Sequence, residues 1–227
     1  MKQKFTILFD LDGTLVDTAP DLMLAHNHVM KKFGYPTKST EDIRNLVGKG
    51  AGALIGRSIW GQAKKEFSKV LDTKIKDEMV KEFVNFYGKN IVNESTLLTG
   101  VKDFLIWCKE QNISMAVCTN KQEHLSNDLL KKIGIYDFFE YVAGSDTFDY
   151  CKPDPRHLTN VVEILDGNVK KTIMIGDSET DANAAKAAEI PVILLENGYT
   201  EKNTTEIYHN HLIKDFIGIE KIISKYL

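Results

Sequence analysis

The sequence predicts an α/β fold in which a parallel β-sheet carries helices on both faces. The first observation is a continuous apolar stretch, residues 5–9, which runs into two carboxylates and suits a strand buried on both sides. The second is that apolar segments alternate with amphipathic ones from residue 100 onward, at the spacing of strand–helix–strand units. The third is that reactive side chains follow the ends of the apolar segments, where parallel sheets gather their functional groups.

Composition narrows the class of protein. The chain has 227 residues, 43% hydrophobic and 27% charged, as in a soluble globular protein with a full core. A net charge of −3 carries no basic surplus, so we expect no nucleic-acid partner. No apolar stretch is long enough for a membrane span. Three cysteines without a CxxC pair favour reduced thiols in a cytoplasmic protein. A monomer and a homodimer both remain open.

The first strand leads into a turn and then a helix. Residues 10–14 are expected to form the turn, with Asp10 and Asp12 two residues apart. Two carboxylates so close together are costly to bury unless a cation joins them or one carries a proton. A plain Asp-Gly turn at a strand end is the alternative. An amphipathic helix follows from Thr18 to Phe33, with Thr18 as its expected N-cap.

Residues 39–93 carry no strand signal and predict a helical insertion. Four helices are expected, at residues 40–46, 50–60, 63–71 and 75–90. A glycine-rich run at residues 47–54 opens the second of them, and its backbone N–H groups are suited to an anion. The alternative is a tight turn between two helices. The run does not match the spacing of a Walker A loop.

The rest of the chain shows the alternation of a parallel sheet. Strands are expected at residues 113–118, 141–143, 171–175, 191–195 and 212–213. Helices are expected at residues 101–111, 125–133, 156–165 and 182–188, followed by a C-terminal helix.

Polar residues gather at the ends of these strands. They are Asp10, Asp12, Thr119, Asn120, Lys152, Asp177 and Asp181. Asp177 and Asp181 stand four residues apart at a helix start, so both can face one cavity. An acidic cluster rich in oxygen and poor in histidine or cysteine suits Mg²⁺ and not zinc. A hydroxyl, a lysine and backbone N–H groups suit a phosphoryl group.

Four motifs, taken together, resemble those of the haloacid dehalogenase superfamily. They are Asp10-x-Asp12-Gly13-Thr14-Leu15-Val16-Asp17-Thr18, Thr119-Asn120, Lys152-Pro153 and Gly176-Asp177-Ser178-x-x-Asp181. They occur in the family's order across nearly the whole chain. The resemblance implies a Rossmann-like core formed by residues 1–16 and 94–227, with residues 17–93 inserted as a helical cap domain.

The resemblance also implies a reaction, the hydrolysis of a small phosphate monoester. Asp10 would attack the phosphorus to give an aspartyl-phosphate, and Asp12 would serve as general acid and then as general base. Thr119 and Lys152 would complete the catalytic set and, with Asn120, hold the phosphoryl group. The residues expected to hold the cofactor, Mg²⁺, are Asp10, Asp12 through its backbone carbonyl, Asp177 and Asp181.

The expected substrate is 2-phosphoglycolate, because residues 17–22 and 47–50 are similar to those of phosphoglycolate phosphatases. Lys49 is then the expected cap cation for the substrate's second charge, with Arg57 as the alternative. A sugar-phosphate phosphatase or phosphomutase, a phosphonate-cleaving enzyme and a non-catalytic binding protein also remain open. Dehalogenation is disfavoured, since the dehalogenating relatives lack the carboxylate that stands here at Asp12.

Overall fold

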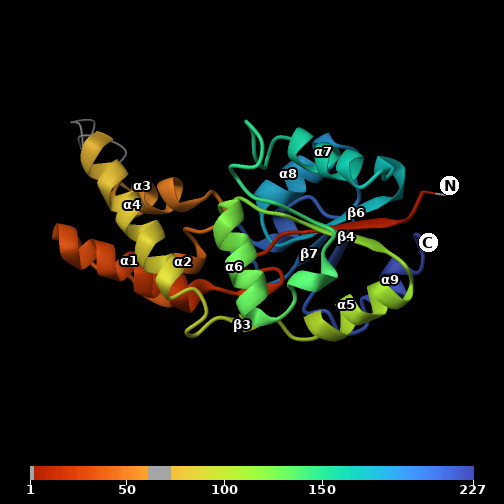
Figure 1. The fold of residues 1–227 in the computed structure, drawn as a ribbon, viewed down its shortest axis with the longest axis horizontal. Helices are drawn as coiled ribbons and strands as arrows, with labels where there is room; N and C mark the ends of the chain where they lie inside the picture. Colours follow the sequence, from red (N-terminus) through yellow and green to blue (C-terminus); the bar gives the residue numbers. More distant parts are fainter. Residues whose placement is uncertain (1–2, 61–72) are drawn as a thin grey trace.

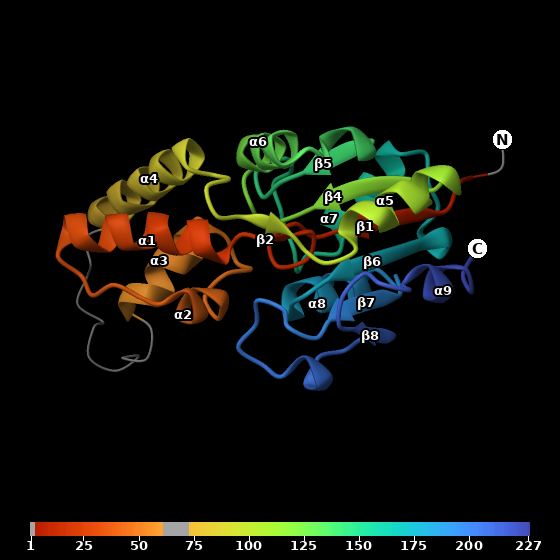
Figure 2. The same ribbon diagram turned by 90° about the horizontal axis from the view of Figure 1, so that it is seen from below.

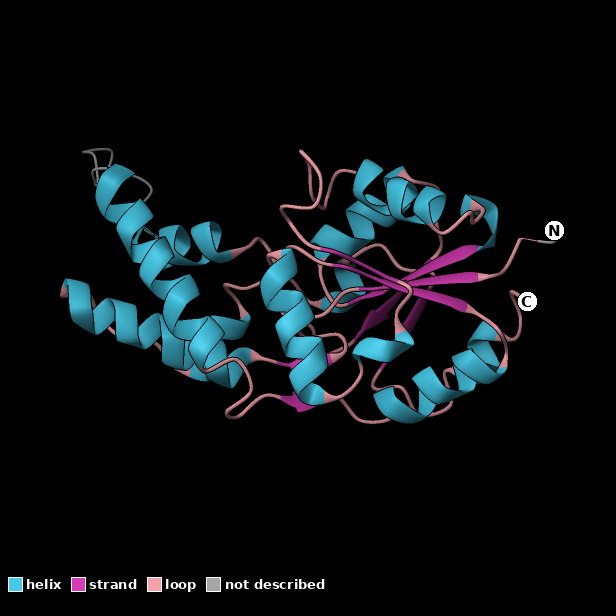
Figure 3. Ribbon diagram, viewed as in Figure 1, coloured by secondary structure: helices cyan, strands magenta, loops and turns pink. Residues whose placement is uncertain are grey.

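The computed structural model describes residues 3–60 and 73–227, and its centre is a six-stranded parallel sheet. The strand order is β5-β4-β1-β6-β7-β8. The bounds are β1 Thr6–Phe9, β4 Ser114–Cys118, β5 Tyr141–Ala143, β6 Thr172–Gly176, β7 Val192–Leu195 and β8 His211–Ile213. Every neighbouring pair is parallel. The predicted α/β fold is therefore confirmed (Figures 1 and 3).

Strand β1 lies inside the sheet, between β4 and β6. Thr6 pairs with Ser114 on one side and with Thr172 on the other, and all of β1 is buried. Ile7 and Phe9 pack into one hydrophobic core, and Leu8 packs into a second one. Since successive side chains of a strand point to opposite faces, both faces of the sheet are covered. This explains why residues 5–9 read as a continuous apolar run.

Helices cover both faces of the sheet. Figure 1 shows α7 and α8 on one side and α5 and α9 on the other, and α6 contributes to the same core as α5. The bounds are α5 Val101–Glu110, α6 Glu123–Ile133, α7 Arg156–Ile164, α8 Glu179–Ala187 and α9 Glu220–Ile223. Short 3-10 helices span Tyr136–Phe138, Val169–Lys171 and Thr204–Glu206. Because the strands are parallel, their carboxyl ends share one edge of the sheet.

The helices of the insertion form a separate group beyond that edge (Figures 1 and 2). They are α1 Ala19–Phe33, α2 Thr40–Arg44, α3 Ala51–Trp60 and α4 Thr73–Lys89. The helix expected at residues 63–71 lies outside the described residues. Across residues 3–60 and 73–227, no helix has both the length and the apolar character needed to cross a membrane.

A small second sheet joins the two connections between the large sheet and the insertion. Strand β2, Val16–Asp17, pairs antiparallel with β3, Thr96–Leu97. One connection runs from the large sheet to the insertion and the other runs back, so this pairing holds the two connecting segments side by side. The sequence did not predict it, because a two-residue strand is too short to show a periodicity.

Thr18 occupies the N-cap position of α1, as expected. Thr18 makes no side-chain capping bond, and its hydroxyl donates to Asp12 Oδ1 at 2.7 Å. The first backbone N–H of the helix, that of Ala19, instead donates to the Tyr199 hydroxyl at 2.9 Å. A nearby carboxylate competes well for a hydroxyl donor, because hydrogen bonds to charged acceptors are the stronger ones. Thr18 therefore belongs to the turn that carries Asp12.

Candidate active site

The turn after β1 presents Asp10 and Asp12 at the carboxyl edge of the sheet. The backbone N–H of Asp10 donates to the Ile175 carbonyl of β6 at 2.9 Å, which fixes Asp10 to the neighbouring strand. The chain then reverses at Gly13, whose φ is +77°. A Cβ at Gly13 would lie 2.2 Å from Asp177 Oδ2. Only glycine therefore allows the turn to lie this close to the carboxylate that follows β6.

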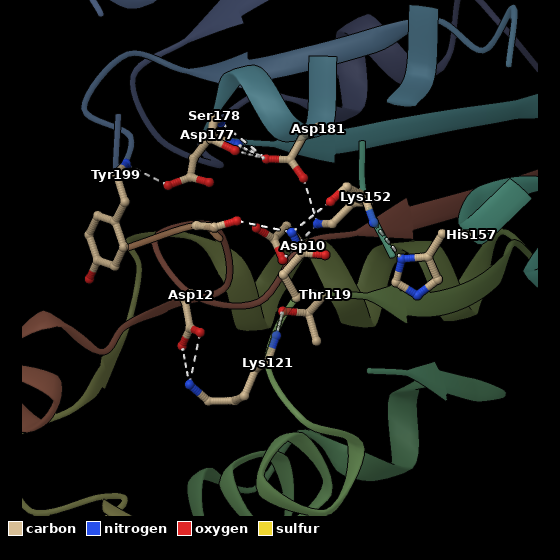
Figure 4. Close-up of polar contacts among 12 residues, drawn as sticks. Asp10, Asp12, Thr119, Lys121, Lys152, His157, Asp177, Ser178, Asp181 and Tyr199 are labelled. Atoms are coloured by element: carbon tan, nitrogen blue, oxygen red, sulfur yellow. Dashed lines mark hydrogen bonds and ion pairs between the residues drawn. The ribbon is translucent and has the colours of Figure 1, made fainter. Parts of the chain in front are cut away.

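A buried lysine links two of the carboxylates. Lys152 is 2% exposed, and its Nζ lies 2.9 Å from Asp10 Oδ1 and 2.6 Å from Asp181 Oδ1 (Figure 4). The other oxygen of Asp181 accepts from the Ser178 backbone N–H at 3.1 Å and from its hydroxyl at 2.7 Å. This capping box explains why α8 begins at Glu179, earlier than expected. Asp181 thus joins the helix start to Lys152.

Asp10, Asp177 and Asp181 form a buried acidic cluster. One carboxylate oxygen from each lies within 4.8 Å of the others. Asp177 Oδ2 also accepts from the backbone N–H of Tyr199 at 2.6 Å. Lys152 can compensate only one of the three carboxylates, so two negative charges are uncompensated when all three are ionised. An oxygen-only donor set with this charge fits a hard divalent cation such as Mg²⁺.

The pKa shifts within the cluster also favour a bound cation. Burial raises the pKa of Asp10 from 3.8 to about 6, although Lys152 opposes the shift. Burial also raises the pKa of Asp177 well above its usual value, with Asp181 and Asp10 adding to the effect. Burial alone would lower the pKa of Lys152, but its two carboxylate partners raise it. The cluster is therefore short of positive charge, which is what a bound cation supplies.

Asp12 is turned toward a different lysine (Figure 4). Lys121 Nζ lies 2.8 Å from each Asp12 oxygen, and the Thr18 hydroxyl is a further donor. Lys121 is 8% exposed and lies over the ring of Tyr87, an α4 residue, at 4.6 Å from the ring centroid. Asp12 is thus held by Lys121 in the loop after β4 and by Thr18, which directly precedes the first helix of the insertion.

The loop after β4 also presents Thr119 and Asn120. The Thr119 hydroxyl accepts from the backbone N–H of Lys121 at 3.2 Å. The Asn120 side chain donates to the Lys152 carbonyl at 2.9 Å and to the Gly48 carbonyl at 3.1 Å. Asn120 therefore connects three parts of the site: the β4 loop, the segment with Lys152 and the insertion.

A cavity of about 300 Å³ lies between the core and the insertion. Its core side includes Asp10, Asp12, Thr119, Asn120 and Lys121, and its insertion side includes Lys49, Phe83 and Tyr87. The glycine-rich run lines it as well. Gly48 and Gly50 have φ of +95° and +82°, and they turn the chain between α2 and α3, so the run is a tight turn beside the cavity.

The two cap cations considered from the sequence differ in their surroundings. Lys49 is exposed and lines the cavity. Arg57 instead donates to the carbonyls of Asn45 and Leu46, each at 3.1 Å, and pairs with Glu201. Arg57 is therefore engaged in tying the insertion together and to the loop after β7, and Lys49 is the better placed of the two.

Comparisons with known proteins agree with this geometry. The family model described as haloacid dehalogenase-like hydrolase matches residues 7–195. The chain belongs to the haloacid dehalogenase-like hydrolases. It is similar to a phosphoglycolate phosphatase of Caulobacter vibrioides, with 38% identity over 216 residues that cover 95% of this chain and 89% of the relative. A phosphoglycolate phosphatase of Mesorhizobium japonicum is 37% identical over 210 residues, covering 92% and 90%.

Solved structures share the whole fold. A crystal structure titled as a predicted phosphoglycolate phosphatase from Haemophilus somnus has a TM-score of 0.88 and 31% identity, covering 98% of this chain and 99% of that one. A β-phosphoglucomutase from Clostridium difficile has a TM-score of 0.80 and 23% identity, covering 98% and 97%. The second likeness is one of fold alone.

Most of the expected site residues lie together at the carboxyl edge of the sheet. Two further site residues, Lys121 and Tyr199, were not predicted from the sequence. Lys121 directly follows Thr119 and Asn120 at a strand end, so its position was the available signal. Tyr199 bonds Asp177 through its backbone N–H, and it lies in the loop after β7 with no motif to mark it.

Proposed function

We propose that this haloacid dehalogenase-like hydrolase is a Mg²⁺-dependent phosphatase of small phosphate monoesters, with 2-phosphoglycolate as its first candidate substrate. The family and the relatives named phosphoglycolate phosphatases support hydrolysis of a phosphoric monoester. The observation that carries the proposal is a buried Asp10 that faces a cavity and adjoins both Lys152 and an acidic cluster. A cavity of about 300 Å³ is at the lower end for small-molecule sites, which favours a small ester.

In the proposed reaction, a carboxylate oxygen of Asp10 forms a bond to phosphorus while the bond from phosphorus to the ester oxygen breaks. The product is an aspartyl-phosphate, which divides one difficult hydrolysis into two easier steps. Lys152 and the Thr119 hydroxyl would hold the non-bridging oxygens, and Asn120 would fix the loop that carries Thr119. Water would then attack the same phosphorus and release phosphate and the Asp10 carboxylate.

Asp12 would move the protons of both steps. It would give a proton to the ester oxygen as that oxygen leaves, and take one from the attacking water in the second step. Asp12 lines the cavity beside Asp10, and its carboxylate is at present paired with Lys121 and Thr18. It must therefore exchange one of these partners for the ester oxygen.

Mg²⁺ would be held by Asp10, the backbone carbonyl of Asp12 and Asp177, with Asp181 as a ligand or as the residue that orients the others. When bound, the ion would neutralise charge on the transferred phosphoryl group. Asp181 already orients Lys152 through one oxygen and the start of α8 through the other. The chain's own contribution is thus a rigid set of oxygen donors around the Asp10 carboxylate.

Residues 17–93 would serve as the cap domain over a core of residues 1–16 and 94–227. A cap that closes over the cavity would exclude water from the reacting phosphorus. Lys49, exposed on the insertion side of the cavity, would add positive charge and draw anionic esters in.

The test is phosphate release with Mg²⁺ from a panel of small phosphate esters, including 2-phosphoglycolate and sugar phosphates, with Asp10→Asn as the matched variant. We expect 2-phosphoglycolate to lead, and Asp10→Asn to lose turnover while its circular dichroism spectrum is unchanged. Product analysis separates the alternative, because a phosphomutase would yield an isomerised sugar phosphate and little free phosphate. A variant that keeps a tenth of the wild-type rate would exclude Asp10 as the nucleophile.

A further inference from the structure

Lys121 has no part in the reaction as proposed so far, although it is a buried cation in the reaction cavity. Its side chain is 5% exposed, and its ammonium contacts both oxygens of Asp12 at 2.8 Å. The ring of Tyr87 covers it, with 4.6 Å between Nζ and the ring centroid. An ammonium has three donors, so one of the Asp12 contacts can be exchanged without leaving the cation unpaired.

Tyr87 brings a second donor, its hydroxyl, to the wall of the same cavity. Its side chain is 1% exposed and lines the cavity. Within the described part of the chain, its hydroxyl has no hydrogen-bond partner. Burial, together with the nearby charges of Asp12 and Asp21, holds the pKa of this hydroxyl well above its usual value. It therefore stays protonated and free to donate, and a buried donor of this kind costs free energy until it finds an acceptor.

The size of the expected leaving group limits which groups can reach its far end. In 2-phosphoglycolate, a carboxylate oxygen is three bonds from the ester oxygen, which corresponds to about 3–4 Å. A group that donates to it lies about 3 Å farther on. Since Asp12 must contact the ester oxygen, the carboxylate must be received close to Asp12. Lys121, at 2.8 Å from Asp12, satisfies this condition.

We propose that Lys121 and the Tyr87 hydroxyl form the subsite that receives a carboxylate on the carbon next to the ester carbon, so that this enzyme selects phosphate esters of 2-hydroxy acids. The inference rests on the proposed phosphatase function and names its substrate class. The two donors come from different parts of the chain, the loop after β4 and helix α4, so the subsite is complete only where the core and the insertion meet.

Occupancy of this subsite also acts on Asp12. The arriving carboxylate competes with Asp12 for the Lys121 ammonium and replaces one of its contacts. Asp12 is then released toward the ester oxygen, while Lys121 keeps an anionic partner. An ester without the carboxylate leaves Asp12 paired as it is now. The subsite therefore favours esters that carry the carboxylate in kcat as well as in binding.

The experiment compares 2-phosphoglycolate with carbamoylmethyl phosphate, its neutral amide of nearly the same shape. The wild-type protein should prefer the acid in kcat/KM by about 10- to 150-fold, the equivalent of roughly 1.5–3 kcal/mol for hydrogen bonds to a charged group. Lys121→Met should reduce this ratio to within threefold, because kcat/KM for the acid should fall far more than kcat/KM for the amide. Tyr87→Phe, which removes one oxygen atom, should lower the ratio by about 3- to 10-fold.

Two lysine variants serve as comparisons. Lys131 is an exposed lysine of α6 that lies over the Tyr136 ring at 4.9 Å, and Lys131→Met should keep the wild-type ratio. The inference assigns the substrate's second charge to Lys121 in place of Lys49, so Lys49→Met should lower kcat/KM for both esters alike. The inference is overturned if the wild-type protein does not distinguish the two esters, if Lys121→Met keeps the ratio or lowers both rates equally, or if Lys49→Met removes the preference.

Binding separates this inference from the proposed function. Calorimetry in the Asp10→Asn background should show tighter binding of the acid than of the amide, and Lys121→Met should abolish the difference. A protein that shows this binding but hydrolyses no ester would keep the subsite and refute the phosphatase. A protein that hydrolyses both esters but binds them equally would keep the phosphatase and refute the subsite.

Discussion

Replacing Asp10 with asparagine should abolish turnover and yet stabilise the metal-free protein at neutral pH. Asp10 is 5% exposed, and its pKa is raised from 3.8 to about 6, mainly by burial. A shift of about two units corresponds to roughly 3 kcal/mol of unfavourable free energy for the buried carboxylate. Lys152 keeps its 2.6 Å contact with Asp181 in the variant, so the lysine is not left alone. We expect the free energy of unfolding to rise by about 1–3 kcal/mol.

The size of the effect depends on pH. Below pH 3.8 the carboxyl is protonated in both the folded and the unfolded protein, and Asp10 makes no difference. Between pH 3.8 and about 6 the unfolded carboxyl is ionised while the folded one keeps its proton, so stability falls as pH rises. Above pH 6 the full penalty is present. The advantage of Asp10→Asn should therefore be absent near pH 4 and complete by pH 7.

The assay is thermal unfolding in EDTA, followed by circular dichroism between pH 4 and 8. About 1–3 kcal/mol corresponds to a rise in Tm of roughly 3–10 °C for a chain of this length. Burial lowers the pKa of His157 to about 4, which gives a pH dependence of opposite sign, but this contribution is the same in both proteins and cancels in the difference. Asp128→Asn, at an exposed position, is the control and should have no such effect. A variant less stable than wild type at pH 7, or a difference equal at pH 4 and pH 7, would refute the reasoning.

Two further substitutions test the architecture of the site. Gly13→Ala should weaken Mg²⁺ binding at least tenfold by calorimetry, because a Cβ at φ +77° would lie 2.2 Å from Asp177 Oδ2; unchanged affinity would show that the turn can move away. Asp21→Ala should lower the free energy of unfolding in urea by about 2–4 kcal/mol, since its buried carboxylate accepts from the backbone N–H groups of residues 93–95. A loss below about 1 kcal/mol would mean that water replaces the carboxylate there.

The fold could be predicted because its signals are local. The strand 5–9 reads as apolar throughout because both of its faces are covered, and the alternation after residue 100 requires parallel strands joined by helices. Parallel strands place their carboxyl ends at one edge, so Asp10, Lys152 and Asp177 were expected to meet from position in the chain alone. The contacts of Lys152 with Asp10 and Asp181 fit that expectation.

The parts that could not be predicted depend on contacts between distant segments. The first backbone N–H of α1, that of Ala19, donates to the hydroxyl of Tyr199, 180 residues farther along the chain, and no local pattern marks such a partner. The pairing of Lys121 with Asp12 spans 109 residues. A lysine after a strand end is compatible with many positions, and its burial beneath Tyr87 is decided by where α4 packs.

The residues that join the insertion to the core also contact the acidic cluster and Asp12. Asp17 pairs with Arg44 of α2 at 2.8 Å and accepts from the Tyr199 hydroxyl. The same Tyr199 donates its backbone N–H to Asp177 at 2.6 Å, and Thr18, next in sequence to Asp17, donates to Asp12. Movement of the insertion should therefore shift Tyr199, which contacts the acidic cluster, and Thr18, which contacts the proposed proton donor Asp12. Substitutions at this joint should alter turnover without contacting the substrate.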